Sequence, residues 1–213
     1  IVNLERGAFS NNTGLTYVNF PINISRIVPE LYSGSGLTNL VIPNWITEIG
    51  DNAFANSKLV SVNISNSVTK IGAAAFANNP YKSFVIPNSV ISIGDYAFME
   101  ATQLTSIVIP DSVTYLGNQV FEGDVSLTGI KLSDNLKTIG MNVFSRNYSL
   151  SRIEYCGKLT GFPISPTCPP ERQAIIDKAV AEKAAAEKTA ATKAAADAAA
   201  KAAAELKVKQ DAE

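Results

Sequence analysis

Hydrophobic and polar positions along most of the chain recur with a period of 22 or 23 residues. The segment LTSIVIPDSVTYLGNQVFEGDVS, which begins at Leu104, aligns closely with LTNLVIPNWITEIGDNAFANSK, which begins at Leu37. Further copies, the last of them shortened, begin at Leu15, Leu59, Tyr81, Leu127 and Leu150. So regular a period indicates a solenoid, in which each repeat forms one coil and buries its apolar residues against its neighbours.

Each repeat opens with a short segment in which apolar and polar residues alternate, as at Ile107 and Ile109 after Leu104. This alternation predicts a β-strand with one buried face. Proline cannot continue a hydrogen-bonded ladder, so we expect the strand to end at Pro43, Pro87 and Pro110. Stacking of the coils then predicts a parallel sheet along one side of the solenoid.

The second half of each repeat contains an apolar pair, then a glycine, then an aromatic residue. Val113 and Leu116 are one such pair. Because glycine tolerates unusual dihedral angles, we expect the backbone to turn again at Gly50, Gly72, Gly94, Gly117 and Gly140. We expect the aromatic residue to lie inside its coil and to continue the core, at Phe54, Phe76, Phe98, Phe121 and Phe144.

The line SIVIPDSVTYLGNQVF has the skeleton I-P-x-S-V-x-x-I-G-x-x-A-F and resembles the BspA-like leucine-rich repeats. The resemblance covers residues 1 to about 160. Members of that family are typically bacterial or protist surface and secreted proteins that adhere to host or matrix proteins or to other cells. The family fixes no catalytic residues, so the resemblance implies adhesion without enzymatic activity.

We predict an α+β repeat protein in two parts, a right-handed leucine-rich-repeat solenoid over residues 1–168 and a long α-helix over residues 169–213. The chain opens with IVNLERGAF, in which Leu4 and Phe9 match Ile49 and Phe54, so it starts half-way through a repeat. A bare terminal coil exposes apolar columns. We therefore expect either a longer precursor with upstream repeats or a contact of Ile1, Val2 and Leu4 with another molecule.

The solenoid pattern lapses after Leu150 into the segment GKLTGFPISPTCPP, which predicts a C-terminal cap over about residues 150–168. The only two cysteines, Cys156 and Cys168, both lie in this cap. A disulfide between them would close a short loop worth about 3 kcal/mol and would fit an oxidising, extracytoplasmic location. The alternative is a pair of free thiols. Two cysteines without histidine do not make a zinc site.

A long helix is predicted to begin at Pro169-Pro170, because the residues after this pair are rich in alanine and contain no glycine or proline. Large apolar residues near its start, Ile175, Ile176 and Val180, are expected to dock on the last repeat. No heptad seam follows. The helix resembles the Ala/Lys/Glu-rich spacer of TolA-like proteins, so it is interpreted as a stalk, with helix-mediated self-assembly as the alternative.

Charge and composition exclude several function classes. The chain has 18 Lys and Arg against 19 Asp and Glu, too balanced for a nucleic-acid partner. It contains no apolar run long enough to span a membrane and no histidine for general base catalysis. No catalytic residue, cofactor or metal site is therefore predicted. Acidic residues recur at turns, at Asp51, Asp95 and Asp111, and capping of those turns is favoured over calcium binding.

The outward positions of the predicted strands form the candidate binding face. Its residues are Tyr17, Asn19, Asn39, Val41, Ser61, Asn63, Ser83, Val85, Ser106, Val108, Lys131 and Arg152. They are mostly small and neutral. One interpretation is a flat surface that binds a protein partner, and the other is that β-branched residues simply suit a parallel sheet. No cluster of aromatic or arginine residues marks a hot spot along the columns.

Two hypotheses on function follow from these patterns. The first is a non-enzymatic module, secreted or on a bacterial cell surface, that binds a protein of a host, a matrix or another cell and is displayed on the helical stalk. The second is a structural subunit that assembles with copies of itself through the solenoid ends and the helix.

Overall fold

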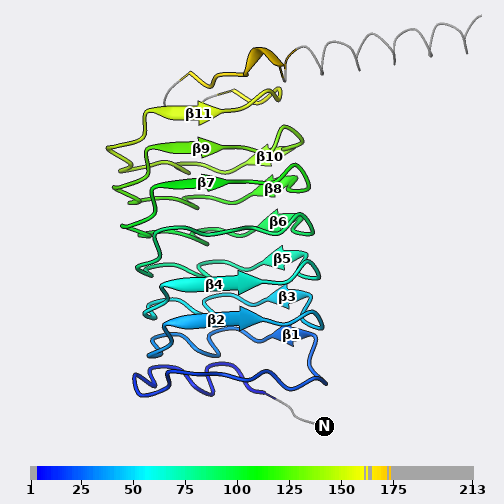
Figure 1. Cartoon of the computed structure of the whole chain (residues 1–213), viewed down its shortest axis with the longest axis vertical. Coiled ribbons are helices and arrows are strands. Elements are labelled where there is room, and N and C mark those ends of the chain that lie inside the picture. Colours follow the sequence, from blue (N-terminus) through cyan, green and yellow to red (C-terminus); the bar gives the residue numbers. More distant parts are fainter. Residues whose placement is uncertain (1–3, 161, 163–164, 172, 174–213) are drawn as a thin grey trace, which may run out of the picture. The chain divides into compact units, whose positions relative to one another are not determined.

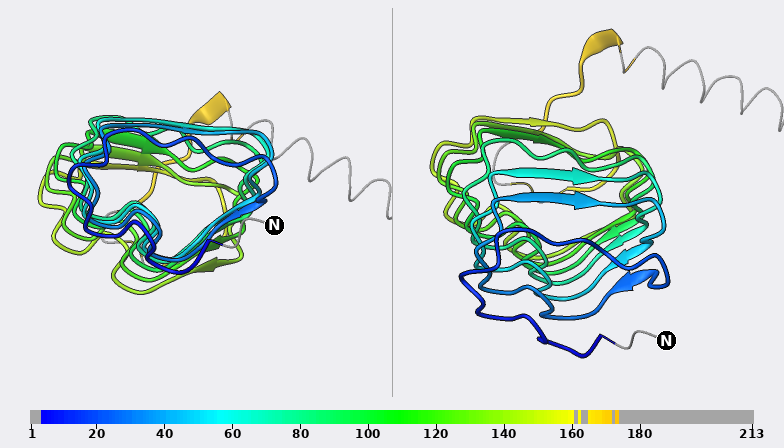
Figure 2. Two further views of the ribbon diagram at one scale, coloured as in Figure 1. Left: turned by 90° about the horizontal axis from the view of Figure 1, so that it is seen from below. Right: turned by 60° about the horizontal axis from the view of Figure 1, so that its bottom comes forward.

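The computed structural model describes residues 4–160, 162, 165–171 and 173. Contacts divide the chain into two compact units, Ile1–Thr167 and Cys168–Glu213. The first unit is a parallel β-solenoid, and its coils follow one another as a stack (Figure 1). Viewed along the stack, successive coils overlie one another closely (Figure 2). The predicted solenoid of 22- to 23-residue coils is therefore confirmed.

The predicted strands form along one side of the stack. They are β2 (Asn39–Ile42), β4 (Ser61–Ile64), β7 (Ser106–Val108), β9 (Gly129–Lys131) and β11 (Arg152–Glu154). Pairing is parallel and matches equivalent repeat positions, with Asn39 opposite Ser61 and Ser106 opposite Gly129. The parallel sheet predicted along this side is confirmed but interrupted, because β2 and β4 form one sheet and β7, β9 and β11 form another.

A second side of the stack carries a sheet that the sequence pattern did not predict. Its strands have two residues each and pair in the order β1 (Arg26–Ile27), β3 (Glu48–Ile49), β5 (Lys70–Ile71), β6 (Ser92–Ile93), β8 (Tyr115–Leu116) and β10 (Thr138–Ile139). Each strand ends on the second residue of the apolar pair in the second half of its repeat, as β8 ends on Leu116. Two residues are too few to show an alternation, which explains why the pattern missed this sheet.

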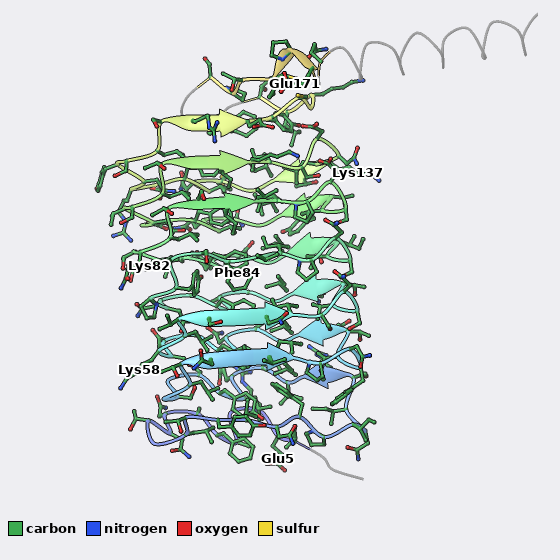
Figure 3. All side chains as sticks on the ribbon, viewed as in Figure 1. Glu5, Lys58, Lys82, Phe84, Lys137 and Glu171 are labelled. Atoms are coloured by element: carbon green, nitrogen blue, oxygen red, sulfur yellow. The ribbon has the colours of Figure 1, made fainter. Side chains whose placement is uncertain are left out.

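Two coils lack the predicted strand, at residues 17–20 and residues 83–86. Each contains a buried aromatic residue, Phe20 or Phe84, where neighbouring coils have aliphatic residues such as Ile42 and Leu40. The Phe84 ring lies edge-on to Phe76, with centroids 4.9 Å apart, on the coil between β4 and β7 (Figure 3). We attribute the interruptions to these rings, because they fill more width than the spacing of about 4.8 Å between paired strands leaves free.

The aromatic residues of the second half-repeat form one stacked column through the core. Neighbouring rings lie 5.6 to 6.2 Å apart between centroids and within 11° of parallel, from Phe9 through Tyr32, Phe54, Phe76, Phe98 and Phe121 to Phe144. The four rings from Phe54 to Phe121 are fully buried. The predicted position of these residues inside the coils is confirmed.

Each ring of this column is flanked by two residues with positive φ, one two positions before it and one two positions after it. In the coil of Phe54 these are Asn52 and Asn56, with φ of 54° and 55°. Between these two residues, every second backbone N–H group points to the next coil. Thus the N–H groups of Asn52, Phe54 and Asn56 all donate to the next coil, to the carbonyls of residues 73, 75 and 77 at 2.7, 2.9 and 3.0 Å.

The glycine that recurs in each repeat is required for a different reason from the one expected. Gly50, Gly72, Gly94, Gly117 and Gly140 all lack positive φ. Instead, a Cβ on Gly94 would lie 2.6 Å from the backbone nitrogen of Ala73, and one on Gly140 would lie 2.4 Å from that of Asn118. Glycine is therefore needed because the neighbouring coil passes too close for a side chain, and the left-handed turn comes two residues later.

The closing segment adds one more rung to the solenoid. Thr167 bridges to Glu154 in parallel, and its N–H donates to the carbonyl of Ile153 at 2.8 Å. Cys156 and Cys168 are disulfide-bonded, which confirms that prediction. Pro170, Glu171 and Gln173 have helical backbone. The rest of the predicted helix, with its proposed docking residues Ile175, Ile176 and Val180, lies outside the described residues.

Candidate functional site

The side chains predicted to point outward from the first side of the solenoid do so. In β2 exposed and buried residues alternate strictly, with Asn39 and Val41 outward. Tyr17 and Val85 expose 74% and 75% of their surface, and Val41 and Val108 remain more than half exposed. The exposed group also includes Asn19, Asn39, Ser61, Asn63, Ser83, Ser106 and Arg152, whereas Lys131 is half-buried.

This face is hollowed at two places rather than flat. The N-terminal hollow, of about 370 Å³, is lined mainly by Tyr17, Phe20, Asn39, Val41, Pro43 and Trp45. The middle hollow, of about 560 Å³, is lined mainly by Val85, Ile86, Asn88, Val108, Pro110 and Lys131. Each hollow lies beside one of the two coils without a strand, so the interruption of the sheet opens the surface there.

Three aromatic side chains line the N-terminal hollow. Tyr17 and Phe20 come from the coil without a strand, and Trp45 comes from the turn that follows β2. The indole is held by a 3.0 Å hydrogen bond from its Nε1 to the carbonyl of Pro21, and the Phe20 ring meets Tyr32 edge-on at 5.9 Å. Phe20 is buried at the base, whereas Tyr17 is exposed and Trp45 is partly exposed. Exposed aromatic side chains in a concave site are typical anchors for a binding partner.

Sequence reasoning found Tyr17 but missed Phe20 and Trp45 as parts of this site. Phe20 follows the strand pattern as a core residue, and Trp45 lies beyond the strand in the next repeat. A signal was nevertheless present, because Trp45 occupies the repeat position that holds serine in later copies, at Ser67, Ser89 and Ser112. A large aromatic residue at an otherwise small turn position indicates a local function.

The middle hollow is mainly aliphatic and has a charged rim. Ile86 and Pro110 are buried at its base, while Val85 and Val108 are exposed at its sides. Lys131 and Asp111 contribute one charge of each sign. The Asp111 carboxylate accepts the N–H of Asp134 at 3.0 Å. The hollow therefore offers apolar surface without a strong net charge.

The recurring aspartates of the turns hold adjacent coils together. The Asp51 Oδ1 atom accepts the N–H of Ala73 at 2.8 Å, and the Asp95 Oδ1 atom accepts that of Asn118 at the same distance. With Asp111, these residues confirm the predicted role as backbone acceptors, although each caps the next coil rather than its own turn. Within the part of the chain that the structure describes, no three His, Cys, Asp or Glu residues form a metal-binding group.

One carboxyl group lies inside the solenoid, away from the face. Asp124 is fully buried, and its Oδ1 atom accepts the N–H of Ala101 at 2.8 Å. Burial raises the pKa of Asp124 to about 8, against the opposing effect of the Ala101 hydrogen bond and with a smaller contribution from the charge of Glu100. This group continues a buried polar column with Ser35, Ser57 and Asn79. Its enclosed position fits a structural role.

A further hollow, of about 500 Å³, lies at the end of the ring column. Residues 139–145 line it together with Thr160 and Phe162. Among the described residues, none accepts a hydrogen bond from the backbone N–H groups of Asn142, Phe144 or Arg146. These three groups are the last in the ladder beside the ring column, so the ladder ends on unpaired donors. Within the described residues there is also no helix that is long and apolar enough to cross a membrane.

Comparison with known proteins identifies the repeat. A model of the BspA type leucine rich repeat region, in six copies, matches residues 1–81 and 69–165. A leucine rich cell surface protein from Faecalibacterium prausnitzii A2-165 is 22% identical over 68% of this chain and 54% of its own, with a TM-score of 0.46. A leucine-rich repeat protein from Bacteroides ovatus ATCC 8483 is 24% identical over 71% and 52%, with a TM-score of 0.49.

The pneumococcal vaccine antigen PcpA is 18% identical over 78% of this chain and 58% of its own, with a TM-score of 0.44. The chain spans about half the length of the first two of these solved structures. A comparison with curated proteins finds no match.

Proposed function

The chain belongs to the BspA-type leucine-rich repeat family, and on that premise we propose that it is a non-enzymatic module that binds a protein partner through the hollowed face of its solenoid. The observation that carries this proposal is the presence of Tyr17, Phe20 and Trp45 in the lining of the N-terminal hollow. Aromatic residues in a concave, partly desolvated site account for much of the binding energy in protein interfaces. The small neutral residues around them leave room for a partner to approach.

Binding is favoured over catalysis by the chemistry of the face. The residues of the two hollows are mainly aliphatic, aromatic or amide side chains, and the sequence contains no histidine. The carboxylates of Asp95 and Asp111 are engaged by backbone N–H groups of the next coil. We therefore assign recognition, and no reaction, to this face.

We place the module outside the cytoplasm, on a bacterial surface or in secreted form. The disulfide-bonded Cys156 and Cys168 support that location, because such bonds persist mainly in oxidising compartments. In this proposal residues 169–213 form a stalk that displays the solenoid, and the partner belongs to a host, a matrix or another cell.

A binding assay with matched variants tests this function. The purified oxidised chain is immobilised and exposed to a panel of extracellular-matrix proteins and to whole host cells, with Tyr17→Ala beside the wild type. Tyr115→Ala, on the other sheet, is the matched control. We expect binding that falls about tenfold in Tyr17→Ala and persists in Tyr115→Ala. Equal binding by all three proteins would reject the face as the site.

Self-assembly is a second candidate, favoured by the unpaired N–H groups of Asn142, Phe144 and Arg146. Each equivalent row inside the solenoid donates to the carbonyls of a following coil, so this row can donate to the carbonyls of another molecule. Light scattering at micromolar concentration distinguishes the two candidates. Large particles without an added partner support assembly, and a strictly monomeric protein contradicts it.

A further inference from the structure

The two hollows lie at equivalent positions of the repeat. Val41 and Pro43 of the N-terminal hollow occupy the same repeat positions as Val108 and Pro110 of the middle hollow. Each hollow also lies between a coil without a strand and the strand that follows it, β2 or β7. Because equivalent positions of the coils stack on one another, a line that joins the hollows runs along the solenoid and across its strands.

The spacing of the hollows selects the conformation of a ligand that would fill both. The N-terminal hollow lies between the coils that begin at Leu15 and Leu37. Most of the middle hollow lies between the coils that begin at Tyr81 and Leu104, and Lys131 lines it from the coil that begins at Leu127. This separation of three coils corresponds to about 14 Å at the usual spacing of neighbouring strands. An extended peptide advances about 13 Å in four residues and brings side chains i and i+4 to the same side.

Other regular conformations match this separation less well. A polyproline II helix repeats its side-chain direction every three residues, after about 9 Å or 19 Å. An α-helix returns a side chain to the same face after seven residues, about 10.5 Å, or after eleven, about 16.5 Å. An extended chain is therefore the best geometric match.

The surface between the hollows suits the backbone of such a chain. Ser61, Asn63 and Ser83 are exposed there, and their side chains make no hydrogen bond to any described residue. Hydroxyl and amide groups can donate to peptide carbonyls and accept from peptide N–H groups. The N-terminal hollow is lined by uncharged residues, and the charges of Lys131 and Asp111 at the middle hollow are of opposite sign. This pattern favours an uncharged segment.

We propose that the two hollows together bind one extended, uncharged segment of a partner protein, which runs along the solenoid and places apolar side chains i and i+4 in them. The aromatic N-terminal hollow takes one of these side chains, and the aliphatic middle hollow takes the other. This inference rests on the proposed function and adds to it the conformation and the residue spacing of the ligand.

Selection from a random peptide library tests the spacing directly. The probe is a library of displayed nine-residue peptides, selected on the full oxidised chain. We expect enrichment of apolar residues at positions i and i+4, with few charged residues between them. Enrichment at i and i+3, at i and i+7 or at no fixed spacing would overturn the inference, and so would the absence of any enriched peptide.

Exposed-site variants then test both hollows with the enriched peptides as probes. Tyr17→Ala alters the N-terminal hollow and Val85→Lys alters the middle hollow, and both residues are mostly exposed, so the fold tolerates the changes. The matched controls are Tyr115→Ala and Ile91→Lys, exposed outside the two hollows. We expect each hollow variant to weaken binding about tenfold and each control to leave it unchanged.

The same variants separate the two proposals when a partner protein is used. If Tyr17→Ala weakens partner binding and Val85→Lys does not, the binding face stands and the two-hollow inference fails. If neither variant weakens binding, both proposals fail. If both variants weaken it but the selected peptides show no i and i+4 pattern, the partner uses both hollows in another conformation and the inference is again overturned.

Discussion

The rings of Phe84 and Phe98 meet edge-on, with centroids 4.8 Å apart and planes at 71°. Phe98 belongs to the stacked column, whereas Phe84 belongs to the coil whose predicted strand is missing. This contact links two features of the molecule, since the same ring packs in the core and belongs to the coil where the sheet is interrupted. The middle hollow opens beside it, so a buried residue shapes the candidate binding face.

Replacement of Phe84 by leucine tests that link. Leu40 fills the equivalent position in the coil that does form a strand. We expect Phe84→Leu to let residues 83–86 pair with a neighbouring strand, to slow amide exchange at Val85 and to weaken ligand binding at the middle hollow. Loss of buried ring volume should cost about 1–2 kcal/mol in free energy of unfolding. Unchanged exchange at Val85 would show that the ring is not the cause of the interruption.

The glycine column gives a second prediction. In Gly94→Ala the new Cβ would lie 2.6 Å from the backbone nitrogen of Ala73, so two adjacent coils must move apart. We expect a loss of about 1–3 kcal/mol in free energy of unfolding. The matched control is Gly14→Ala, where the nearest atom is the Asn12 Oδ1 atom at 3.6 Å, and its effect should stay within about 0.5 kcal/mol. Urea denaturation measures both values, and similar losses would refute the steric explanation.

The period of the sequence was sufficient to predict the stacked coils, the parallel register of β2 with β4 and the buried ring column. These features depend on many equivalent residues, so one deviating coil does not hide them. The six-stranded sheet was not predicted, because each of its strands, such as Glu48–Ile49, is too short to show a pattern in the sequence. The positions with positive φ were not predicted, because residues such as Glu30, Ala74 and Tyr96 occupy them instead of glycine.

The candidate site was only half predicted, and for a different reason. The alternation of apolar and polar residues along a strand shows which side chains point outward. The outward positions of Tyr17, Val41 and Val85 were therefore predicted correctly. The hollows depend on where the sheet breaks, and that depends on the width of Phe20 and Phe84 inside the coil. An apolar pattern treats a phenylalanine and a leucine alike. To predict where hollows form on the surface of a repeat protein, side-chain volumes are therefore needed as well as the period of the apolar residues.

The disulfide yields a third prediction. Reduction of the bond between Cys156 and Cys168 should loosen the closing segment, which pairs with the solenoid through Thr167, by its bridge to Glu154 and its backbone hydrogen bonds with Ile153 and Tyr155. We expect faster amide exchange at Thr167 and Tyr155 and a loss of about 3 kcal/mol in free energy of unfolding. Exchange at Phe76, deep in the core, is the internal control. Intact mass should stay constant on alkylation without reductant, and two added alkyl groups would contradict the bond.

The buried column around Asp124 sets up a pH dependence. At the equivalent position Asn79 donates its Nδ2 to the carbonyls of Phe54 and Phe76 at 2.9 and 3.0 Å. The Asp124 carboxyl accepts from Ala101 through Oδ1, and its Oδ2 atom has no hydrogen-bond partner among the described residues. A protonated carboxyl resembles the asparagine, whereas an ionised one leaves a charge in the core beside Tyr81, whose own pKa is raised by burial and by that charge.

Stability should therefore fall as this carboxyl ionises. The pKa of Asp124 is about 8 in the folded chain, while an aspartate in the unfolded chain has a pKa of about 4. The folded state holds one more proton between these values, so the free energy of unfolding decreases as pH rises from about 4 to 8 and then levels off. Asp124→Asn cannot ionise, and we expect it to exceed the wild type at pH 8 by on the order of 5 kcal/mol, with a much smaller difference at pH 4. Urea denaturation of both proteins across this range measures the effect, and parallel pH profiles would show that the buried carboxyl titrates alike in both states.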